Sequence, residues 1–568
     1  MKRNIIVLSF LSASIGFGYA QSAIGAYSVS QPDMKGTARY MGMAGAFGAL
    51  GGDLTSISQN PAGIGVYRSN DVGFTLDLDL QNSTTQNEGK QYKIDETKFL
   101  LNNIGAVFTL RLDNQVCPNL NFGFTYNKGA SFNRVYGGNI NTLKMSMSNY
   151  IAGIANYAGV TEGDVSWADG INPYNPGYDY FTAPWITTLA YDSYVISPQE
   201  TAHGTQWYGL WQDSMTGKDT SGSGSFLMQE SGCTNDFNIV LGGNIANKLY
   251  WGMNFQIVNL NYNLNTFWGE SLRNAYRLNE AGNAIVEDAD WNYNGAYNMS
   301  GTGFSYQLGL IFKPVQTLRL GFAFHTPTWY NINEEFVGSM DYYGAKDSYW
   351  SDTNEGIPGY NSYGFRTPWK ILASAAGVLG NNFIVSFDYE WANYGKMHFR
   401  DTQYFSNGYY DDWYDPWPWS MSSRSSYTDY INSDDYYAPE NNQIATYFKS
   451  TNTFRVGVEF KPVSFFSVRA GYSYVSSPVK NEVRNNQTEV ITANLFPSYR
   501  LDNSTNYITA GIGFRYSHFY ADLAYVYKHI SSEYHAFSPD PGNYKISSPQ
   551  SRLSLNNNQI ILSAGLRF

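Results

Sequence analysis

The feature that most constrains this chain is a period-two alternation of apolar and polar residues over long segments. The clearest case is the C-terminal run "NNNQIILSAGLRF", in which every second residue from Ile560 to Phe568 is apolar. The same alternation marks "NTFRVGVEFKP", "FFSVRAGYSYV" and "FYADLAYVYKH". Successive side chains of a strand point to opposite faces, and globular strands average about 5 or 6 residues. Longer strands with one apolar face therefore predict a sheet with a lipid-facing side.

Fourteen segments follow this pattern, and an even number favours a closed, single-chain transmembrane antiparallel β-barrel. The composition agrees, because the chain holds 48 Tyr, 34 Phe and 14 Trp, and aromatic residues favour strands and membrane interfaces. The predicted strands are 72–80, 98–112, 119–134, 236–247, 249–263, 302–313, 317–330, 367–379, 382–395, 451–461, 464–476, 505–517, 519–531 and 557–568. The alternative is a secreted β-sandwich or propeller array, which uses shorter strands with turns every 8 to 12 residues or so.

The connections between these segments alternate in length. Short turns such as "KPVQ", "GNN" and "KPVS" alternate with long polar stretches, including about 100 residues between the third and fourth segments. Short periplasmic turns and long outer loops are typical of outer-membrane barrels. This pattern predicts that the N-terminus and Phe568 both lie on the periplasmic side.

The first twenty residues, "MKRNIIVLSFLSASIGFGYA", predict a signal peptide that is cleaved after Ala20. We expect residues 1–20 to be this peptide, residues 21–70 a plug, and residues 71–568 a barrel with extracellular loops in the outer membrane of a Gram-negative bacterium. The formal charge of −11, which becomes −13 on loss of Lys2 and Arg3, speaks against nucleic-acid binding, because that needs clustered cations.

The segment before the first strand is rich in glycine and alanine, as in "MGMAGAFGALGGD". A barrel of this width has an open lumen unless something fills it, and small residues allow backbone to pack closely in a confined space. Residues 21–70 are therefore predicted to enter the lumen as a plug.

The run "KGTARYMGMAGAFGALGGDLTSISQNPAGIGVYRSNDVGFT" resembles the N-terminal hatch of the FadL/TodX outer-membrane transporters of hydrophobic compounds. The resemblance covers an acidic residue, Asp53, and an Asn-Pro-Ala-Gly motif formed by Asn60, Pro61, Ala62 and Gly63. It implies a fourteen-stranded barrel, and it marks these five residues as hatch elements. Taken physically, Asn60 before Pro61 is excluded from the helical region, and Gly63 can adopt a positive φ.

Several charged residues fall on the inward face of the predicted strands. They are Arg319, His325, Lys370, Asp388, Glu390, Arg455, Glu459, Arg469, Arg515 and Asp522. An inward arginine can bind a carboxylate head group through its planar fork, which makes Arg319, His325, Arg455, Arg469 and Arg515 candidate ligand contacts. The alternative is that these charges pair with one another and with the plug.

Two loop features and the C-terminus complete the candidate sites. In "LKMSMSNYIAGIANYAGV" the apolar residues follow helical spacing after a possible cap at Asn141, which predicts an amphipathic helix. The run "GYYDDWYDPWPWSMSS" holds Trp413, Trp417 and Trp419, either as a hydrophobic capture patch or as packed loop aromatics. Leu566 and Phe568 form a candidate assembly signal for the barrel assembly machinery.

No catalytic or metal-binding motif stands out in the sequence, so no enzyme activity, cofactor or metal is expected. The resemblance implies passive uptake of a hydrophobic ligand, with long-chain fatty acids first and aromatic hydrocarbons second. The alternatives are a structural or adhesive barrel with partner-binding loops, or a polar-solute porin. We expect outer-membrane lipid to surround the barrel.

Overall fold

The computed structural model describes residues 22–568, except 32, 113, 115, 168–169, 176–182, 213–217, 280–281, 381, 401–436, 494 and 540–546. The predicted signal peptide and the three tryptophans Trp413, Trp417 and Trp419 lie outside the described residues. No helix in the described part of the chain is both long enough and apolar enough to cross a membrane.

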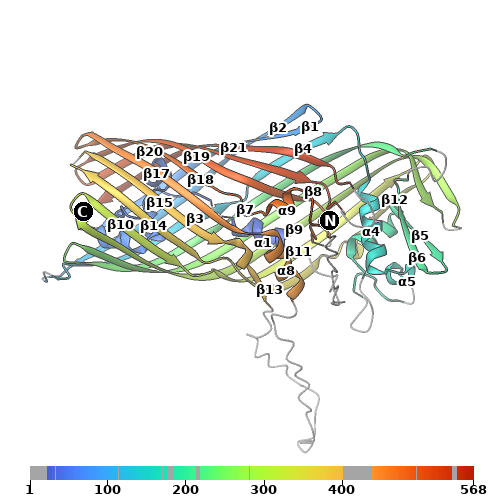
Figure 1. Ribbon diagram of the computed structural model, residues 1–568, viewed down its shortest axis with the longest axis horizontal. Coiled ribbons are helices and arrows are strands. Elements are labelled where there is room, and N and C mark those ends of the chain that lie inside the picture. The colour runs from blue at the N-terminus through green and yellow to red at the C-terminus, as the bar shows by residue number, and fades with distance from the viewer. Residues whose placement is uncertain are drawn as a thin grey trace, which may run out of the picture.

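The wall is a closed antiparallel β-barrel of fourteen strands, which confirms the predicted fold class (Figure 1). The first strand pairs with both the second and the last, so the sheet has no free edge along this seam. Each predicted segment overlaps one wall strand. These strands are β1 (Asp71–Asn87), β2 (Lys90–Arg111), β3 (Asn119–Ser131), β7 (Ser221–Ile245), β8 (Leu249–Leu278), β9 (Ala284–Val315), β10 (Leu318–His325), β14 (Lys370–Leu379), β15 (Phe383–Asn393), β17 (Ser450–Val463), β18 (Phe466–Val475), β19 (Tyr499–Tyr516), β20 (Phe519–His535) and β21 (Gln550–Arg567).

The end of the barrel opposite the short turns carries the long connections, and we call it the long-loop end. Further strands occur there beyond the wall. A sheet of extended strands projects there beyond the barrel, while the C-terminus lies at the opposite, short-turn end (Figure 1). β8 and β9 have 30 and 32 residues, although about 9 to 11 suffice to span a bilayer. The strands added to the wall sheet are β4 (Arg134–Ile140), β11 (Trp329–Tyr343), β12 (Ser348–Asp352), β13 (Gly359–Arg366) and β16 (His398–Arg400). At the same end, β5 (Ile196–Thr201) and β6 (Gly204–Gly209) form a separate two-stranded sheet.

Helices occur in the N-terminal segment and at the long-loop end. Those in the N-terminal segment are α1 (Ala23–Ser30), α2 (Ala38–Gly42), α3 (Ser56–Gln59) and η1 (Pro61–Val66). Those at the long-loop end are α4 (Met147–Ala158), α5 (Glu162–Val165), α6 (Trp185–Asp192), η2 (Thr353–Gly356), η3 (Tyr394–Lys396), α8 (Ala438–Tyr447) and α9 (Asn481–Arg484). The predicted amphipathic helix is α4, but its cap is Ser146 rather than Asn141, because the Ser146 side chain accepts a hydrogen bond from the Ser148 backbone N–H.

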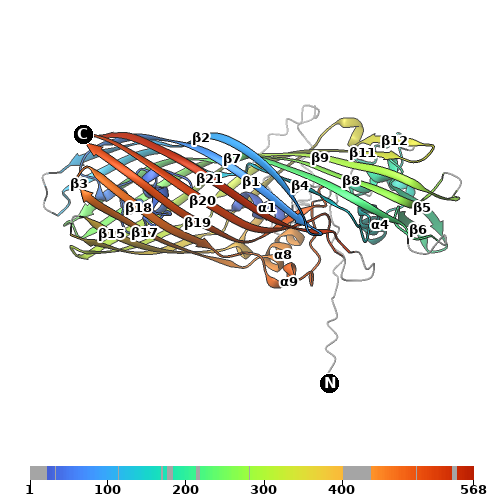
Figure 2. The same ribbon diagram turned by 90° about the horizontal axis from the view of Figure 1, so that it is seen from above.

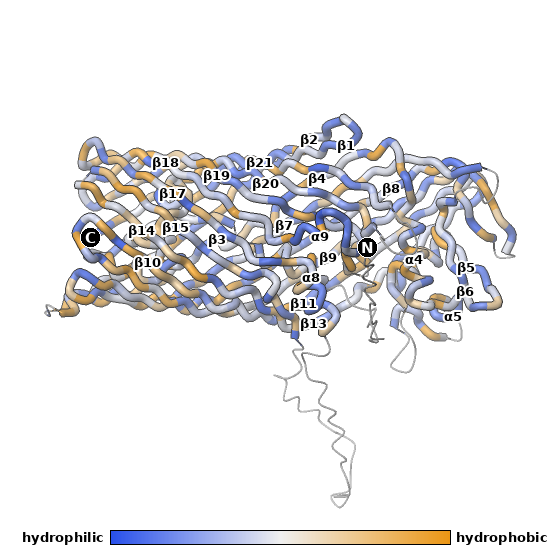
Figure 3. Tube along the Cα trace, viewed as in Figure 1, coloured by the Kyte–Doolittle hydropathy of each residue, from blue (hydrophilic) through white to orange (hydrophobic). Residues whose placement is uncertain are grey.

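Outward-facing residues near the short-turn end form an apolar band, and hydrophobic residues are frequent along the chain at that end (Figure 3). On six strands, the first outward-facing residue beyond this band, toward the long-loop end, is an asparagine: Asn82, Asn235, Asn259, Asn452, Asn506 and Asn558. Neighbouring tyrosine hydroxyls donate to four of these, as Tyr126 does to Asn235 at 2.7 Å and Tyr472 to Asn506 at 2.8 Å. An apolar band that ends in aromatic and polar residues matches the lipid-facing surface of a transmembrane barrel.

Beyond this asparagine ring the apolar face of the sheet changes sides. In β9, Phe304 and Leu308 point outward and are about half exposed, whereas Trp291 and Tyr293 farther along point inward and are buried. The inward aromatics pack with α4 and α6 in one large core. The extension is therefore built like a water-soluble sheet, with its apolar side covered and its polar side exposed.

Residues 22–70 lie inside the barrel, where they contact each of the fourteen wall strands (Figure 2). The expectation that this segment begins at the same end of the barrel as Phe568 is wrong. The Tyr27 ring of α1 lies 5.0 Å from that of Phe448 and 5.8 Å from that of Tyr394, at the long-loop end. The evenly apolar α1 is buried among aromatic side chains there, and the chain then descends to the start of β1.

Candidate ligand site and plug in the lumen

We call the part of the lumen nearer the short-turn end its lower half and the part nearer the long-loop end its upper half. In the lower half, the plug contacts the wall closely at glycines. The backbone of Gly48 lies against Gly321 of β10, and that of Gly65 lies against Gly243 of β7. A methyl group added at Gly252 of β8 would overlap the Pro61 carbonyl of the plug. Plug backbone and wall backbone are therefore in direct contact, and any side chain at these positions would force them apart.

The Asn-Pro-Ala-Gly motif forms the start of η1. Asn60 is fully buried and extended, with φ −134° and ψ 103°, as expected for a residue before proline. Its Oδ1 accepts from the Ala62 N–H at 3.1 Å, and its Nδ2 donates to the Gly48 carbonyl at 2.6 Å. The motif is thus a capped turn that also holds the preceding glycine-rich loop.

The expectation of a positive φ at Gly63 is wrong, because the residue lies within η1 and is not among those with positive φ. The left-handed residues of this segment include Gly51 and Gly52, at φ 62° and 68°, together with Ala44 and Gly45, at φ 50° and 71°. Gly63 has no room for a side chain, since an added Cβ would lie 3.0 Å from the Gly51 Cα. Close approach of two backbones, rather than a turn, therefore requires glycine there.

Asp53 organises the centre of the plug. Its carboxylate accepts hydrogen bonds from the Thr37 hydroxyl at 2.7 and 2.8 Å and from the Thr55 N–H at 2.9 Å. Burial raises the pKa of the Asp53 carboxyl above its usual range, while the nearby Arg39 guanidinium and these hydrogen bonds oppose the rise. Asp53 thereby joins residues 37 and 55, which are distant in the plug sequence.

Buried ion pairs connect the plug to the wall at several heights. Lys35 lies 2.9 Å from Asp77 and 3.3 Å from Asp79, both on β1, and its side chain is fully buried. Asp33 lies 2.7 Å from Lys528 of β20, and Arg39 lies 3.1 Å from Glu459 of β17. Since removing one member of such a pair leaves a buried charge, these contacts hold the plug in register with the wall.

Four of the five candidate lumen contacts bind the plug or other wall residues. The Arg319 guanidinium donates to the Leu50 carbonyl at 2.7 Å, and the His325 ring lies 2.8 Å from the Gln59 carbonyl. Arg455 pairs with Glu390, and Arg469 pairs with both Glu459 and Asp522. Arg515 is exposed at the short-turn end. None of the five lines either of the two cavities described next.

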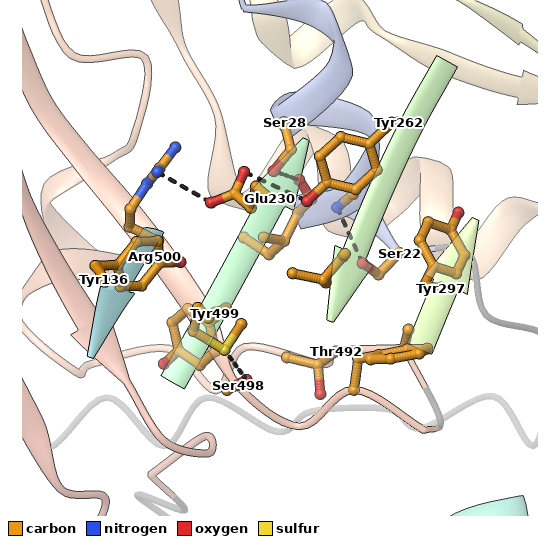
Figure 4. A pocket seen from close by; sticks show the side chains of 16 residues that line it. Ser22, Ser28, Tyr136, Glu230, Tyr262, Tyr297, Thr492, Ser498, Tyr499 and Arg500 are labelled. Atoms are coloured by element: carbon orange, nitrogen blue, oxygen red, sulfur yellow. Dashed lines mark hydrogen bonds and ion pairs between the residues drawn. The ribbon is translucent and has the colours of Figure 1, made fainter. Parts of the chain in front are cut away.

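The larger cavity lies in the upper lumen, where one side of α1 faces the wall (Figure 4). The empty space at this site, including the adjoining solvent to which the cavity is partly open, is about 640 Å³. Its lining is mainly aromatic and aliphatic, and it comprises Ser22, Ile24, Gly25, Ser28, Tyr136, Met228, Glu230, Tyr262, Leu264, Tyr297, Thr492, Ala493, Phe496, Ser498, Tyr499 and Arg500. An apolar pocket with a few convergent polar groups is the usual form of a small-molecule site.

The polar side of this cavity is a charge-balanced cluster. Glu230 pairs with Arg134 at 2.7 Å and with Arg500 at 3.2 Å. Arg500 also pairs with Asp502 at 3.0 Å, and the Tyr262 hydroxyl donates to Glu230 at 3.4 Å. Two cations therefore face two carboxylates, and the cluster presents hydrogen-bonding groups without an excess of charge.

A second cavity of about 360 Å³ lies on the other side of α1, lined in part by Tyr27, Gln31 and Asp502. The Gln31 amide donates to the Asp502 carboxylate at 2.7 Å. Residues of α1 thus line both cavities, with Ser22, Ile24, Gly25 and Ser28 on one side and Tyr27 on the other. The first helix of the plug is therefore the partition between the two spaces.

Sequence reasoning did not identify Glu230, Tyr262, Tyr297, Tyr499 or Arg500 as site residues. They lie in the part of the strands where the aromatic side chains face inward. A search for strands with an outward apolar face does not identify inward-facing residues there as a binding site. The available signal is the same period-two pattern with aromatic residues on the opposite face, as in "WNYNGAYNM".

The remaining site predictions concern the surface and metal binding. Leu566 and Phe568 project outward at the short-turn end, where they are 50% and 59% exposed. Among the described residues, no group of three or more His, Cys, Asp or Glu side chains is arranged to hold a metal ion.

No family model matches the sequence, and no curated protein matches it either. Among solved structures, a FadL homologue from Pseudomonas aeruginosa is 12% identical and has a TM-score of 0.50, with 94% of this chain and 99% of that chain covered. The Pseudomonas putida toluene transporter TodX is 12% identical over 94% and 99% of the two chains, with a TM-score of 0.45. The Ralstonia pickettii toluene transporter TbuX is 10% identical over 95% and 100%, with a TM-score of 0.42. The likeness to the FadL homologue shows that this chain has a FadL-type fold.

Proposed function

We propose that this protein is an outer-membrane transporter for passive uptake of hydrophobic compounds, with long-chain fatty acids as the first candidate ligand and aromatic hydrocarbons as the second. The observation that carries the proposal is the larger cavity, whose wall is partly the plug itself. A ligand bound against Ile24 and Gly25 of α1 contacts the element that separates this space from the second cavity. Binding and plug position are thereby linked.

Apolar burial supplies the driving force. Contacts with Leu264, Met228 and Phe496 remove ligand surface from water, and each buried CH₂ group contributes about 0.8 kcal/mol. The Glu230–Arg500 pair and the Tyr262 hydroxyl orient the polar end of an amphipathic ligand. No chemical step is needed, so we propose no enzyme activity.

The lower plug is the barrier that the ligand must pass. Backbone contacts at Gly252 and Gly321 leave no room between plug and wall there. We propose that residues 22–70 act as a hatch, in which Asp53 and Asn60 to Gly63 hold the closed arrangement. The short-turn end faces the periplasm in this proposal, and the extension faces outward from the cell.

The first test is uptake of a labelled long-chain fatty acid by a deletion strain at matched surface levels of each variant. The native protein is expected to restore uptake, and Gly63→Val is expected to alter it, because the added side chain meets the Gly51 backbone. Gly377→Val is the matched control, since no atom lies within 4 Å of an added Cβ there. It is expected to behave as native.

Failure of the folded native protein to restore uptake would reject the fatty acid, and toluene uptake in the same strains would then test the aromatic candidate. Failure with both ligands would reject the transport proposal. Native uptake by Gly63→Val would reject the hatch role. A polar-solute porin would instead conduct ions in planar bilayers.

A second candidate function, partner binding, is favoured by the long extension of β8 and β9 with its helices α4 and α6. An adhesive barrel would lose function when the exposed β5–β6 hairpin is removed, and it would keep that function in Gly63→Val. A transporter should instead keep its function when this hairpin is removed and lose it in Gly63→Val.

A further inference from the structure

Cations gather at the short-turn end of the lumen. The last inward-facing position of six wall strands is basic: Arg111, Lys313, Arg319, Lys461, Arg515 and Arg567. The plug adds Arg39 and Arg68 to the same end. The chain as a whole carries a formal charge of −11. The basic end is therefore opposite in sign to the rest of the molecule.

The carboxylates that bind these cations already have several partners. Glu459 lies 3.1 Å from both Arg39 and Lys461, and 2.6 Å from Arg469. Asp71 lies 2.9 Å from Arg567 and also accepts a hydrogen bond from the Tyr520 hydroxyl at 3.1 Å. A third carboxylate, Asp522, is already paired with Arg469 at 2.6 Å. Positive charge at this end therefore exceeds what these three carboxylates can balance.

Three of the arginines converge on one place. Arg39 and Arg567 both donate to the Gly52 carbonyl, at 3.3 and 2.9 Å, so their guanidinium groups are neighbours. The Arg567 guanidinium lies 5.5 Å from the centre of the Tyr520 ring. Arg515 of β19 is paired directly with Tyr520 of β20 in the sheet register. Arg515 therefore lies at the edge of the same cluster.

Arg515 differs from the other two because it has no bonded partner. Within the described part of the chain its side chain makes no hydrogen bond or ion pair, and the residue is exposed at the mouth. Its fork of N–H donors is open to solvent, beside two like-charged groups. A planar guanidinium with free donors is suited to bidentate binding of a carboxylate or phosphate group.

We propose that the short-turn mouth holds an anion-binding site formed by Arg515, Arg39 and Arg567, and that its ligand carries a carboxylate or phosphate group. The excess positive charge concentrates anions at the mouth, and the free Arg515 donors supply the direct contact. The site is separate from the upper cavity, where Arg500 is balanced by Glu230 and Asp502. Its existence does not depend on the proposed transport.

Two sources can supply such a group: an amphiphile with a carboxylate head, or a soluble phosphate. The test is calorimetric titration of the purified full-length protein in a neutral maltoside detergent at low ionic strength. The probes are inorganic phosphate, octanoate and, as the uncharged match for octanoate, octanol. Low salt is needed because exposed charges are screened.

We expect saturable binding of phosphate, octanoate or both, weakened at least tenfold by Arg515→Gln. Arg515→Lys, which keeps the charge but lacks the fork, should give an intermediate affinity. Arg111→Gln, on β2 and four strands around the wall from β19, is the matched control, and it should change the affinity less than twofold. Heat-modifiable gel mobility verifies that each variant is folded.

Binding of phosphate alone assigns the site to a soluble anion, and binding of octanoate but not octanol assigns it to a carboxylate amphiphile; both support the site. The proposal is overturned if neither anion binds saturably. It is also overturned if Arg111→Gln weakens binding as much as Arg515→Gln, because a diffuse potential would then explain the effect.

Discussion

The N-terminal segment contacts the wall differently in the lower and upper halves of the lumen. In the lower half, plug and wall meet through backbone, with Gly48 against Gly321 and Pro61 against Gly252, and buried ion pairs join them. In the upper half, α1 meets the wall through large side chains, and two cavities remain beside it.

This difference shows how one short segment can both seal and bind. Backbone-to-backbone contact leaves little space between plug and wall, whereas large aromatic side chains of unequal shape leave the two cavities open. Substitutions in the lower half should therefore cost stability. Those in the upper half should cost ligand binding with little change in stability.

The largest loss of stability is expected for Lys35→Met. The change leaves Asp77 and Asp79 buried without their cation, and breaking a buried ion pair costs about 3–5 kcal/mol. The free energy of unfolding in urea, followed by tryptophan fluorescence, measures this loss. Lys98→Met is the matched control, because the Lys98–Glu96 pair is partly exposed to solvent and surface pairs contribute about 0–1 kcal/mol. Equal losses in the two variants would refute a tight lower seal.

The next largest loss is expected for Gly252→Val, whose side chain would overlap the Pro61 carbonyl. Overpacking of this kind costs about 1–3 kcal/mol. The midpoint of heat-modifiable gel mobility measures the change, with Gly377→Val as the control in open space. A Gly252→Val protein as stable as that control would show that plug and wall can separate freely.

A smaller loss is expected for Asn60→Ala, which removes the cap of η1 and the hydrogen bond to the Gly48 carbonyl. A lost cap of this type costs about 1 kcal/mol. Asn393→Ala removes the comparable cap of η3 outside the plug. Protection of plug amides from hydrogen exchange should fall in Asn60→Ala alone, and a loss of protection in both variants would contradict a local role.

The smallest change in stability, and the largest in binding, is expected for Gly25→Leu in α1. An added Cβ would lie 3.5 Å from the Ser22 hydroxyl, an ordinary contact, and leucine favours a helix over glycine by roughly 0.8 kcal/mol. The side chain would fill part of the larger cavity and weaken ligand binding by about tenfold, a loss of about 1.4 kcal/mol.

Direct binding of a fluorescent fatty-acid analogue measures the Gly25→Leu effect. Gly163→Leu in the exposed helix α5 is the control, since the nearest atom to its added Cβ is 3.7 Å away. Unchanged binding in Gly25→Leu would place the ligand elsewhere than in this cavity.

The sequence predicted the wall well and the extension poorly, for one physical reason. Against lipid, apolar residues such as Phe304 and Leu308 point outward, and the period-two pattern locates each strand. Past the asparagine ring the surroundings become water, so Trp291 and Tyr293 of the same strand point inward. The predicted strand therefore began only at residue 302, where the apolar side faces lipid, although β9 begins at Ala284.

The candidate site was predicted in part. The glycine-rich composition indicated a segment confined in the lumen, and the proline fixed the backbone of Asn60. The direction of the plug could not be read, because its evenly apolar first helix gives no preference for either end. The cluster of Glu230, Arg134 and Arg500 is contributed by β7, β4 and β19, and their meeting depends on strand register rather than on local sequence.

The seam between β1 and β21 has a consequence for the order in which this molecule is made. The two strands are the first and last of the wall, and they pair from Asp71 with Arg567 to Gln86 with Arg552. The cylinder cannot close until the final residues have been synthesised and delivered, and contacts so distant in sequence form slowly. The segment before β1 touches strands on both sides of this seam and around the whole wall, so its full set of contacts requires the closed cylinder. Closure of the β1–β21 seam thus completes the enclosure of the N-terminal segment by the C-terminal end of its own chain.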